Sequence, residues 1–258
     1  MRRTVFIVGT AGAGKTVLTG VLKERIEAYG PSAITVNLDP AVKQLPYDPN
    51  VDVRDYVSYD DFLKSGLGPN SALIAAVDSA LLHVDDIIRE IDEYNADYVI
   101  IDTPGQMEVY AYRVGGQMIT RALAAGNPSL VVFLIDALFF EEPLSIASAL
   151  SLASSIALRL GLPQINAVSK ADLLLPEVVE EIIPRLGEEG FLEGLIERAE
   201  GVNAQARLMA LKLVEAIREA GFIGGLIPVS SLNVETVDAL YGRIQQVLTG
   251  GEEPSAYK

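Results

Sequence analysis

Short runs of apolar residues, many of them β-branched, recur along the chain and are separated by longer amphipathic stretches. The apolar runs are continuous rather than alternating, which is typical of strands that are covered on both faces in a parallel sheet. Six strands are predicted in this way, over residues 4–8, 33–38, 97–102, 129–136, 164–169 and 225–229. The pattern therefore predicts an α/β fold, a mostly parallel sheet flanked by helices on both faces.

Two segments interrupt this alternation of strands and helices. Residues 40–82 are rich in Pro, Gly, Asp and Tyr, with no long apolar run before Leu73, and we interpret them as a partly helical insertion. Residues 174–224 are predicted to be mostly helical, and residues 250–258 to be a disordered tail. We expect a single domain over 1–249 that contains both segments.

Residues 143–158 form the longest charge-free stretch, but five serines interrupt it. A membrane span needs about 20 apolar residues, so this stretch is predicted to be too short and too polar to be one. We expect residues 144–158 to pack closely as a helix, either within a subunit or between subunits. The first apolar run leads into a glycine loop and does not form a secretory signal, so we expect a cytoplasmic protein.

Composition excludes several function classes. The 258 residues include 50% hydrophobic and 21% charged residues, as in an ordinary globular protein, and the net charge of −15 argues against binding to nucleic acid or to an anionic membrane. The absence of cysteine excludes disulfides, thiolate metal sites and cysteine nucleophiles. His83 is the single histidine, and no nucleophile-elbow serine accompanies it, so we expect it to be structural or on the surface.

A glycine-rich motif follows the first predicted strand. Residues 9–16, GTAGAGKT, match the phosphate-binding loop G-x-x-x-x-G-K-[ST]. Its glycines let the backbone direct several N–H groups at one phosphate, and the helix predicted over 16–29 directs the positive end of its dipole there. Lys15 reaches the β- and γ-phosphates and assists catalysis, and the Thr16 hydroxyl ligates magnesium. The nucleotide contacts expected here are Gly12, Ala13, Gly14, Lys15, Thr16 and Val17.

The third predicted strand ends in the sequence Asp102-Thr-Pro-Gly105-Gln106. A carboxylate at this place in phosphate-loop hydrolases holds the water shell of magnesium, which assigns Asp102 to the metal. Gly105 can present its N–H to the γ-phosphate, a contact that is lost after hydrolysis. The alternative is an ordinary Pro-Gly turn, which the phosphate-binding loop upstream makes the weaker interpretation.

The fifth predicted strand ends in Ser169-Lys-Ala-Asp172, which resembles the guanine-reading motif N-K-x-D of GTPases. Asp172 can accept hydrogen bonds from both N1–H and the exocyclic amine of guanine, while the aliphatic stem of Lys170 lies on the base. Ser169 stands in place of Asn and can donate one hydrogen bond, which leaves the strictness of GTP over ATP open. Ser230 follows the sixth strand, in a segment that resembles the loop closing over guanine O6.

The insertion contains Gly68-Pro69-Asn70, which as a bare tripeptide is a turn. Gly68 is expected to supply a permissive bend, and Pro69 fixes φ, so that the Asn70 amide is presented at low entropic cost. Together with GTAGAGKT, NLDPA, DTPGQME and SKAD, this tripeptide gives the chain a resemblance to the GPN-loop GTPases that runs from residue 4 to about residue 231.

This resemblance implies a P-loop NTPase fold and a magnesium-dependent enzyme that hydrolyses GTP to GDP and phosphate. It also implies a homodimer in which the Asn70 of one subunit approaches the γ-phosphate bound by the other. It further implies a nucleotide-dependent switch in the assembly of protein complexes such as RNA polymerase, whose subunits are the expected clients. The absence of a long C-terminal extension is similar to the archaeal members of the family.

The residues themselves leave two other classes open. A P-loop metabolic kinase or phosphotransferase would need an acceptor pocket lined by Arg or Lys, whereas the insertion is acidic. A partitioning-type ATPase that binds membrane or DNA is opposed by the net charge and by the SKAD motif.

The hydrolytic residues are expected where an attacking water can be oriented and charge on the γ-phosphate stabilised. Gln106 can orient this water, and Glu108 can accept a hydrogen bond from it, although Glu108 is alternatively a solvated carboxylate at a helix start. Asp39 can hold either a magnesium-bound water or the attacking one. No arginine finger is obvious in the sequence. The candidates that flank the switch segments are Arg54, Arg113 and Arg121.

Overall fold

The computed structural model describes residues 2–249, with the side chain of Glu108 left out; the tail predicted over 250–258 lies outside the described residues. Within this range, seven parallel strands form one sheet in the order β3-β2-β4-β1-β5-β6-β7. The strands are β1 (Arg3–Gly9), β2 (Ala33–Asn37), β3 (Val51–Asp52), β4 (Tyr98–Asp102), β5 (Ser129–Asp136), β6 (Gln164–Ser169) and β7 (Ile227–Val229). The predicted parallel sheet is confirmed.

The six longer strands coincide with the six predicted apolar runs, with ends that shift by at most two residues. The sequence did not predict β3, which has only two residues and pairs with β2 through Val36 and Val51. The helices in the described range are α1 (Lys15–Ala28), α2 (Tyr59–Lys64), α3 (Pro69–Ala80), α4 (Val84–Glu93), α5 (Met107–Tyr110), α6 (Val114–Ala124), α7 (Pro143–Leu160), α8 (Ile183–Arg185), α9 (Phe191–Arg198), α10 (Ala204–Glu219) and α11 (Val234–Thr249).

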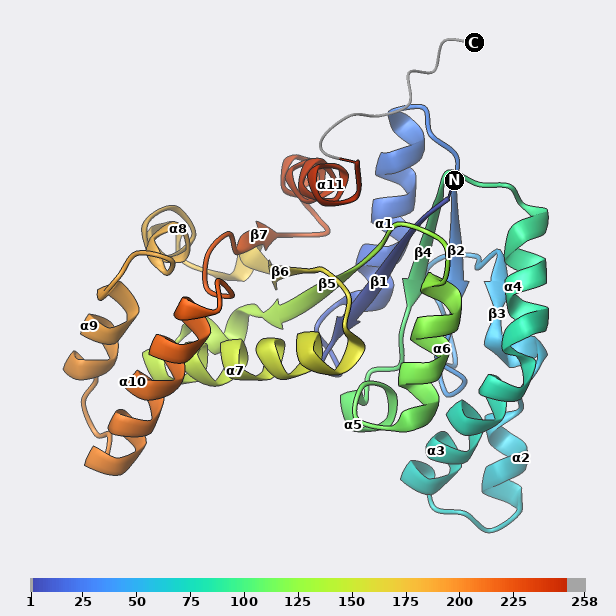
Figure 1. Ribbon diagram of the computed structural model, residues 1–258, viewed down its shortest axis with the longest axis horizontal. Coiled ribbons are helices and arrows are strands. Elements are labelled where there is room, and N and C mark those ends of the chain that lie inside the picture. Colours follow the sequence, from blue (N-terminus) through green and yellow to red (C-terminus); the bar gives the residue numbers. More distant parts are fainter. Residues whose placement is uncertain (1, 250–258) are drawn as a thin grey trace.

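The sheet separates two hydrophobic cores, because successive residues of a strand point to opposite faces. On β1, Val5 and Ile7 belong to the core that α1 and α11 cover, whereas Phe6 and Val8 belong to the larger core under α3, α4, α6, α7, α9 and α10. Figure 1 shows α1 and α11 on one side of the sheet and α6 and α7 on the other. Burial on both faces explains why the strands have continuous apolar sequences.

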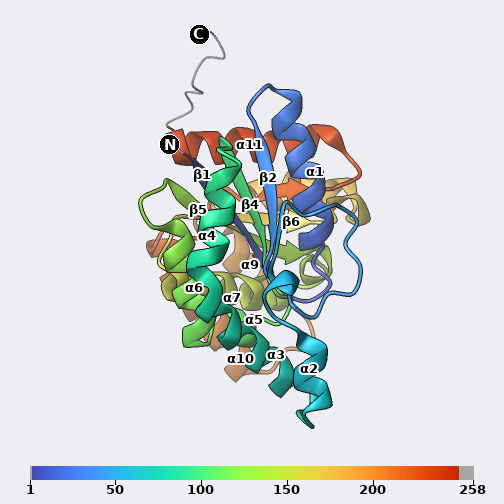
Figure 2. The same ribbon diagram turned by 90° about the vertical axis from the view of Figure 1, so that its right-hand side faces the viewer.

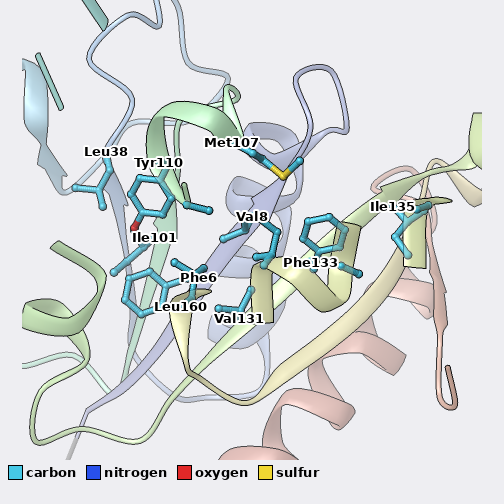
Figure 3. Packing of buried hydrophobic residues seen from close by; sticks show 14 of the residues in the cluster. Phe6, Val8, Leu38, Ile101, Met107, Tyr110, Val131, Phe133, Ile135 and Leu160 are labelled. Carbon is cyan, nitrogen blue, oxygen red and sulfur yellow. The ribbon is translucent and has the colours of Figure 1, made fainter. Parts of the chain in front are cut away.

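The short helix α5 follows β4 and closes the larger core near the carboxyl end of the sheet. Figure 3 shows Met107 lying over Val8, and Tyr110 beside Ile101 and Leu38. Tyr110 is fully buried, and its hydroxyl shares a hydrogen bond of 2.8 Å with Thr120 of α6. Met107 and Tyr110 therefore anchor the segment that follows Gly105 in the larger core.

The segment 40–82 contains an irregular stretch, the strand β3 and the helices α2 and α3. The helix pair α2–α3 projects beyond the sheet in both views (Figures 1 and 2). Residues 174–224 contain a turn of π-helix over Val178–Ile182 and the helices α8, α9 and α10. Arg218 of α10 forms an ion pair with Glu193 of α9, which joins the last two of these helices.

The serine-spaced stretch forms α7, which runs to Leu160 and has 18 residues. By length and composition alone this helix is apolar enough to cross a membrane, but 44% of it is buried inside the molecule, where it packs against α10, α6 and β5. Ser151 and Ser154 donate hydrogen bonds of 2.8 Å to backbone carbonyls one turn earlier. The close packing expected for this stretch is found within the subunit.

Candidate nucleotide-binding site

The loop after β1 has the backbone shape that an anion-binding loop requires. Gly12 and Gly14 adopt left-handed conformations, with φ of 80° and 86°, in which a side chain would be strained. Gly14 is also the residue from which α1 starts, so the unpaired N–H groups of the first helical turn face the loop. Gly9 is needed for a different reason: a Cβ there would lie 2.9 Å from the carbonyl oxygen of Leu134 on β5.

Lys15 points back into this loop. Its ammonium donates a hydrogen bond of 3.1 Å to the carbonyl oxygen of Thr10, and the residue is buried. Burial lowers the pKa of Lys15 below its ordinary value, and the negative charges of Asp102 and Asp39 oppose that shift. A phosphate in the loop would give this buried cation an anionic partner in place of a neutral carbonyl.

Asp102 ends β4 in a buried position beside α1. Its Oδ2 accepts a hydrogen bond of 3.2 Å from the hydroxyl of Tyr47, while Oδ1 is buried without a hydrogen-bond partner among the described residues. Burial raises the pKa of Asp102 to about 6, although Thr16, Lys15 and Tyr47 lower it. The unpartnered oxygen marks a place where a cation or its water would satisfy a buried acceptor.

The donor set around Asp102 fits magnesium. Magnesium prefers hard oxygen ligands and usually keeps several waters, with one or two carboxylates and substrate phosphates completing its shell. The Thr16 hydroxyl and the Asp102 carboxylate supply such oxygens beside the phosphate-binding loop. No group of three or more His, Cys, Asp or Glu side chains that could hold a metal occurs in the described part of the chain.

Gly105 lies directly against the phosphate-binding loop, and its predicted contact with the γ-phosphate stays a prediction. A Cβ on Gly105 would be 3.3 Å from the Cα of Ala11 and 3.5 Å from the Lys15 ammonium. The following residue, Gln106, is the residue from which α5 starts, and its side chain is exposed. Glu108 lies on α5, but its side chain is outside the described part of the structure, so its predicted role stays a prediction.

Asp39 lies in the turn after β2, near the same site. Its Oδ1 accepts a hydrogen bond of 2.9 Å from the backbone N–H of Ala41, and its charge acts on both Lys15 and Asp102. Its own backbone N–H donates to Asn37 Oδ1 at 3.0 Å. The Asp39 carboxylate thus shapes the turn and contributes negative charge beside the phosphate-binding loop.

The three candidate arginines differ in their availability. Arg54 is bound by Asp52, with its Nη2 at 2.5 Å from Asp52 Oδ2, and it also donates to the carbonyl oxygen of Val42. Arg113 lies 3.6 Å from Asp78. Arg121 is exposed on α6. Within the subunit, Arg54 therefore serves the structure of its own loop.

The motif after β6 and the loop after β7 together form a pocket of ≈ 240 Å³. The start of α1 closes the pocket from the other side, so Ala13, Gly14 and Val17 share its wall with Asp172 and Ser230. Lys170 also lines it, from a left-handed backbone conformation with φ of 56°. The structure thus brings the phosphate-binding loop and the proposed base-reading residues to one cavity.

Ser169 differs from the expectation that it donates to the base. It is buried, and its hydroxyl donates a hydrogen bond of 3.3 Å to the carbonyl oxygen of Ile135. The reason is the pairing of β5 with β6, which sets Ser169 beside Asp136. The hydroxyl hydrogen is directed at the neighbouring strand and not at the pocket that Asp172 lines.

The structure does not bring Asn70 to the phosphate-binding loop of its own subunit. Asn70 lies in the first turn of α3, is exposed, and forms no side-chain hydrogen bond within the described residues. Figure 1 shows the connection between α2 and α3 at the end of the projecting helix pair, away from the start of α1. Gly68 has an ordinary φ of −68°, so the expected permissive bend is wrong at this residue, and Gly66, with φ of 95°, makes the turn instead.

Sequence reasoning missed three residues of the site. Thr10 provides the carbonyl that holds Lys15, Tyr47 holds Asp102, and Asp136 forms an ion pair with Lys170. Asp136 ends an apolar strand at the same edge of the sheet as Asp102, so its position was a usable signal. Tyr47 lies in an irregular segment, where no hydrophobic periodicity indicates which way its side chain points.

The chain is similar in sequence and structure to several known proteins. Residues 7–250 match a family model described as a conserved hypothetical ATP binding protein. The GPN-loop GTPase PAB0955 of Pyrococcus abyssi is 38% identical over 178 residues, which are 68% of this chain and 70% of that protein. GPN-loop GTPase 3 of Saccharomyces cerevisiae is 30% identical over 254 residues, which are 96% of this chain and 93% of that protein.

GPN-loop GTPase 1 of Dictyostelium discoideum is 28% identical over 243 residues, which are 93% of this chain but only 60% of that relative. Among solved structures, the crystal structure of PAB0955, a GTPase in apo form from Pyrococcus abyssi, superposes with a TM-score of 0.83 and 30% identity. The superposition covers 96% of this chain and 98% of that one.

Proposed function

This chain belongs to the GPN-loop GTPase family, and on that premise we propose that it binds GTP with magnesium and hydrolyses GTP to GDP and phosphate as a homodimeric switch. The observation that carries the proposal is the shared cavity. Residues of the phosphate-binding loop and Asp172 line the same ≈ 240 Å³ pocket. A nucleotide bound there would have its base beside Asp172 and its phosphates at the loop.

The residues of this chain then have separate tasks. Backbone N–H groups around Gly12 and Gly14 and the Lys15 ammonium bind the β- and γ-phosphates. Gly105, whose backbone lies beside Lys15, offers its N–H to the γ-phosphate. Thr16 and Asp102 hold magnesium or its waters, and Asp39 adds a carboxylate for a bound water. Magnesium supplies Lewis-acid stabilisation of charge on the phosphate oxygens.

Gln106 and Glu108 are assigned to the attacking water. Gln106 has an exposed side chain one residue after Gly105, so its amide is free to orient a water opposite the leaving group. Glu108 follows two residues later on α5 and is assigned as the acceptor of a hydrogen bond from that water. Orientation of this water lowers the activation barrier of hydrolysis without making GTP bind more tightly in the ground state.

The proposed dimer explains the position of Asn70. This residue is exposed at the start of α3, in the helix pair α2–α3 that projects beyond the sheet (Figure 1), so its amide is available to the site of a second subunit. Large apolar side chains are exposed nearby: Leu67 precedes the tripeptide, and Val114 and Met118 lie on α6, which packs against α3. A second copy of the chain would cover such residues.

The family resemblance extends the proposal to a cytoplasmic role in assembling protein complexes such as RNA polymerase. A phosphotransferase is the second candidate, because a hollow beside Asp39 has Lys43 and Arg54 in its wall. Arg54, however, is already neutralised by Asp52, which leaves little positive charge to bind an anionic acceptor.

The test is to measure nucleotide use by the purified protein. We expect preferential binding of GTP over ATP in competition, slow release of inorganic phosphate from GTP with magnesium, and a dimer in analytical ultracentrifugation with a non-hydrolysable GTP analogue. Preference for ATP would contradict the assignment of Asp172, and transfer of phosphate to a small molecule would favour the phosphotransferase. Capture of clients by the Gln106→Ala variant loaded with GTP tests the assembly role.

A further inference from the structure

Tyr47 lies in the irregular segment between β2 and β3, yet two elements of the nucleotide site hold its side chain. The phenol ring lies against α1 at Gly20, where a Cβ would be only 3.2 Å from Tyr47 Cβ. Gly20 therefore leaves the space that the tyrosine occupies. The hydroxyl reaches across to the end of β4 and donates to Asp102 Oδ2 at 3.2 Å.

This hydrogen bond distinguishes the two oxygens of the Asp102 carboxylate. Oδ2 accepts the hydrogen bond of the phenol, and the Thr16 hydroxyl also interacts with the carboxylate, whereas Oδ1 is buried and has no hydrogen-bond partner within the described residues. Asp102 is almost completely buried, with a relative exposure of 1%, so bulk water does not supply a hydrogen bond to Oδ1. The orientation that the phenol sets leaves one oxygen for a cation or its water.

We propose that Tyr47 is a positioning residue that holds the Asp102 carboxylate in the orientation required by the water shell of magnesium. The inference deepens the proposed function and rests on it. A ligand that is already oriented loses less conformational freedom when the metal binds, and hydrogen bonds from the outer shell supply that orientation in many metal sites. Tyr47 acts through Asp102 and does not itself bind the nucleotide.

The opposite role for the same contact is to block the metal site. If the phenol occupied the place of the metal, its removal would raise the affinity for the cation instead of lowering it. A third role is packing alone, in which the ring on Gly20 matters and the hydroxyl does not. Positioning predicts that removal of the hydroxyl lowers the affinity for the cation, and blocking of the metal site predicts that it raises this affinity. Packing alone predicts an effect only when the ring is removed, so substitutions of Tyr47 distinguish the three roles.

The experiment measures the cation directly. Manganese replaces magnesium and is titrated into the complex of the full chain with GDP, and free manganese is followed by electron paramagnetic resonance. Tyr47→Phe keeps the ring against Gly20 and removes only the hydroxyl. We expect the manganese affinity to fall about tenfold or more, the usual effect of losing an outer-shell partner. GDP affinity in EDTA should equal that of the parent.

Tyr94→Phe is the matched control. The Tyr94 hydroxyl donates a hydrogen bond of 2.9 Å to the carbonyl oxygen of Asn50, in the same region of the molecule but without contact to Asp102. We expect this variant to bind manganese as the parent does. A second variant, Tyr47→Leu, removes the ring as well and should lose at least as much affinity as Tyr47→Phe.

Two results would overturn the inference while the proposed function stands. Manganese affinity that is unchanged or higher in Tyr47→Phe excludes positioning by the hydroxyl. Loss in Tyr47→Leu alone assigns Tyr47 a packing role. A parent protein that binds no guanine nucleotide would instead overturn the proposed function, and the inference with it.

Discussion

Lys170 and Asp136 form an ion pair across the ends of two adjacent strands, with the Lys170 ammonium 2.7 Å from Asp136 Oδ2. The other oxygen of Asp136 accepts a hydrogen bond of 3.1 Å from the backbone N–H of Leu138, so the carboxylate is anchored on both sides. Lys170 reaches it from a left-handed backbone conformation that residues with a Cβ seldom adopt. The pair holds the lysine stem along the wall of the pocket that Asp172 also lines.

Replacing Asp136 by Asn should weaken nucleotide binding. The amide oxygen still accepts from Leu138, but the charge that holds Lys170 is gone, and a charge-assisted hydrogen bond contributes about 1.5–3 kcal/mol. We expect about a tenfold loss of GDP affinity, measured by fluorescence polarisation of a labelled nucleotide. Glu141→Gln removes an exposed carboxylate outside this pocket and is the control. Parent-like affinity in Asp136→Asn would show that the ion pair does not position Lys170.

Asp172→Asn should change which base the pocket accepts. The amide offers a donor where the carboxylate had an acceptor, so GTP is bound more weakly and xanthosine triphosphate more strongly. One mismatched pair of polar groups of this kind typically costs about 10²-fold or more in binding. Competition between GTP and xanthosine triphosphate, in the parent and in the variant, measures the change in relative affinity. If the variant binds GTP as the parent does, Asp172 does not read the base.

The stability of the metal-free protein should fall as pH rises toward about 6. Burial raises the pKa of Asp102 to about 6, whereas the unfolded chain loses this proton near 3.8, so between these values the folded state binds more protons. Unfolding by urea in EDTA should show a decline of up to about 3 kcal/mol across this window. The difference between the parent and Asp102→Asn isolates this group. An equally steep decline in the variant would assign the pH dependence to other residues.

Gln106→Ala should slow hydrolysis far more than it weakens binding. A contact made mainly in the transition state lowers kcat and leaves ground-state affinity nearly unchanged. Loss of one such contact commonly costs about 10²-fold in rate. Single-turnover release of phosphate gives the rate, and labelled GDP gives the affinity. Glu108→Ala is expected to behave in the same way, and parent rates in both variants would remove these residues from the mechanism.

Mixing two inactive subunits tests whether Asn70 acts in trans. Asn70→Ala keeps an intact phosphate-binding loop, and Lys15→Ala keeps an intact Asn70. If the Asn70 of one subunit serves the site of the other, each mixed dimer regains one complete site, although neither homodimer hydrolyses GTP well. Phosphate release from the mixture should therefore exceed that of either variant alone. Action of Asn70 within its own subunit predicts no recovery.

The elements of the site that the sequence predicted share one physical reason. Asp102 ends an apolar strand, Lys15 and Asp172 lie in segments that follow one, and parallel strands bring their carboxyl ends to one edge of a sheet. Their meeting at one edge of the sheet thus depended on strand direction, which continuous apolar runs indicate well.

The elements that the sequence did not predict depend on exact tertiary geometry. The Ser169 hydroxyl is directed at Ile135 because of the register between β5 and β6, which no local pattern encodes. Tyr47 reaches Asp102 only because an irregular segment folds over α1 at Gly20. Gly68 looked like the flexible residue of its turn, but Pro69 starts α3 directly, and the left-handed residue is Gly66.

The pocket draws its wall from residues as distant in the chain as Ala13 and Leu232, and the loop that completes it follows all seven strands. During synthesis, the phosphate-binding loop leaves the ribosome first and the closing loop only after the whole sheet has been made. A ligand stabilises only the state that binds it, so GTP cannot support the half-made chain. Until residue 232 emerges, the nascent protein depends on its own apolar contacts, and the nucleotide stabilises only a chain in which the pocket is complete.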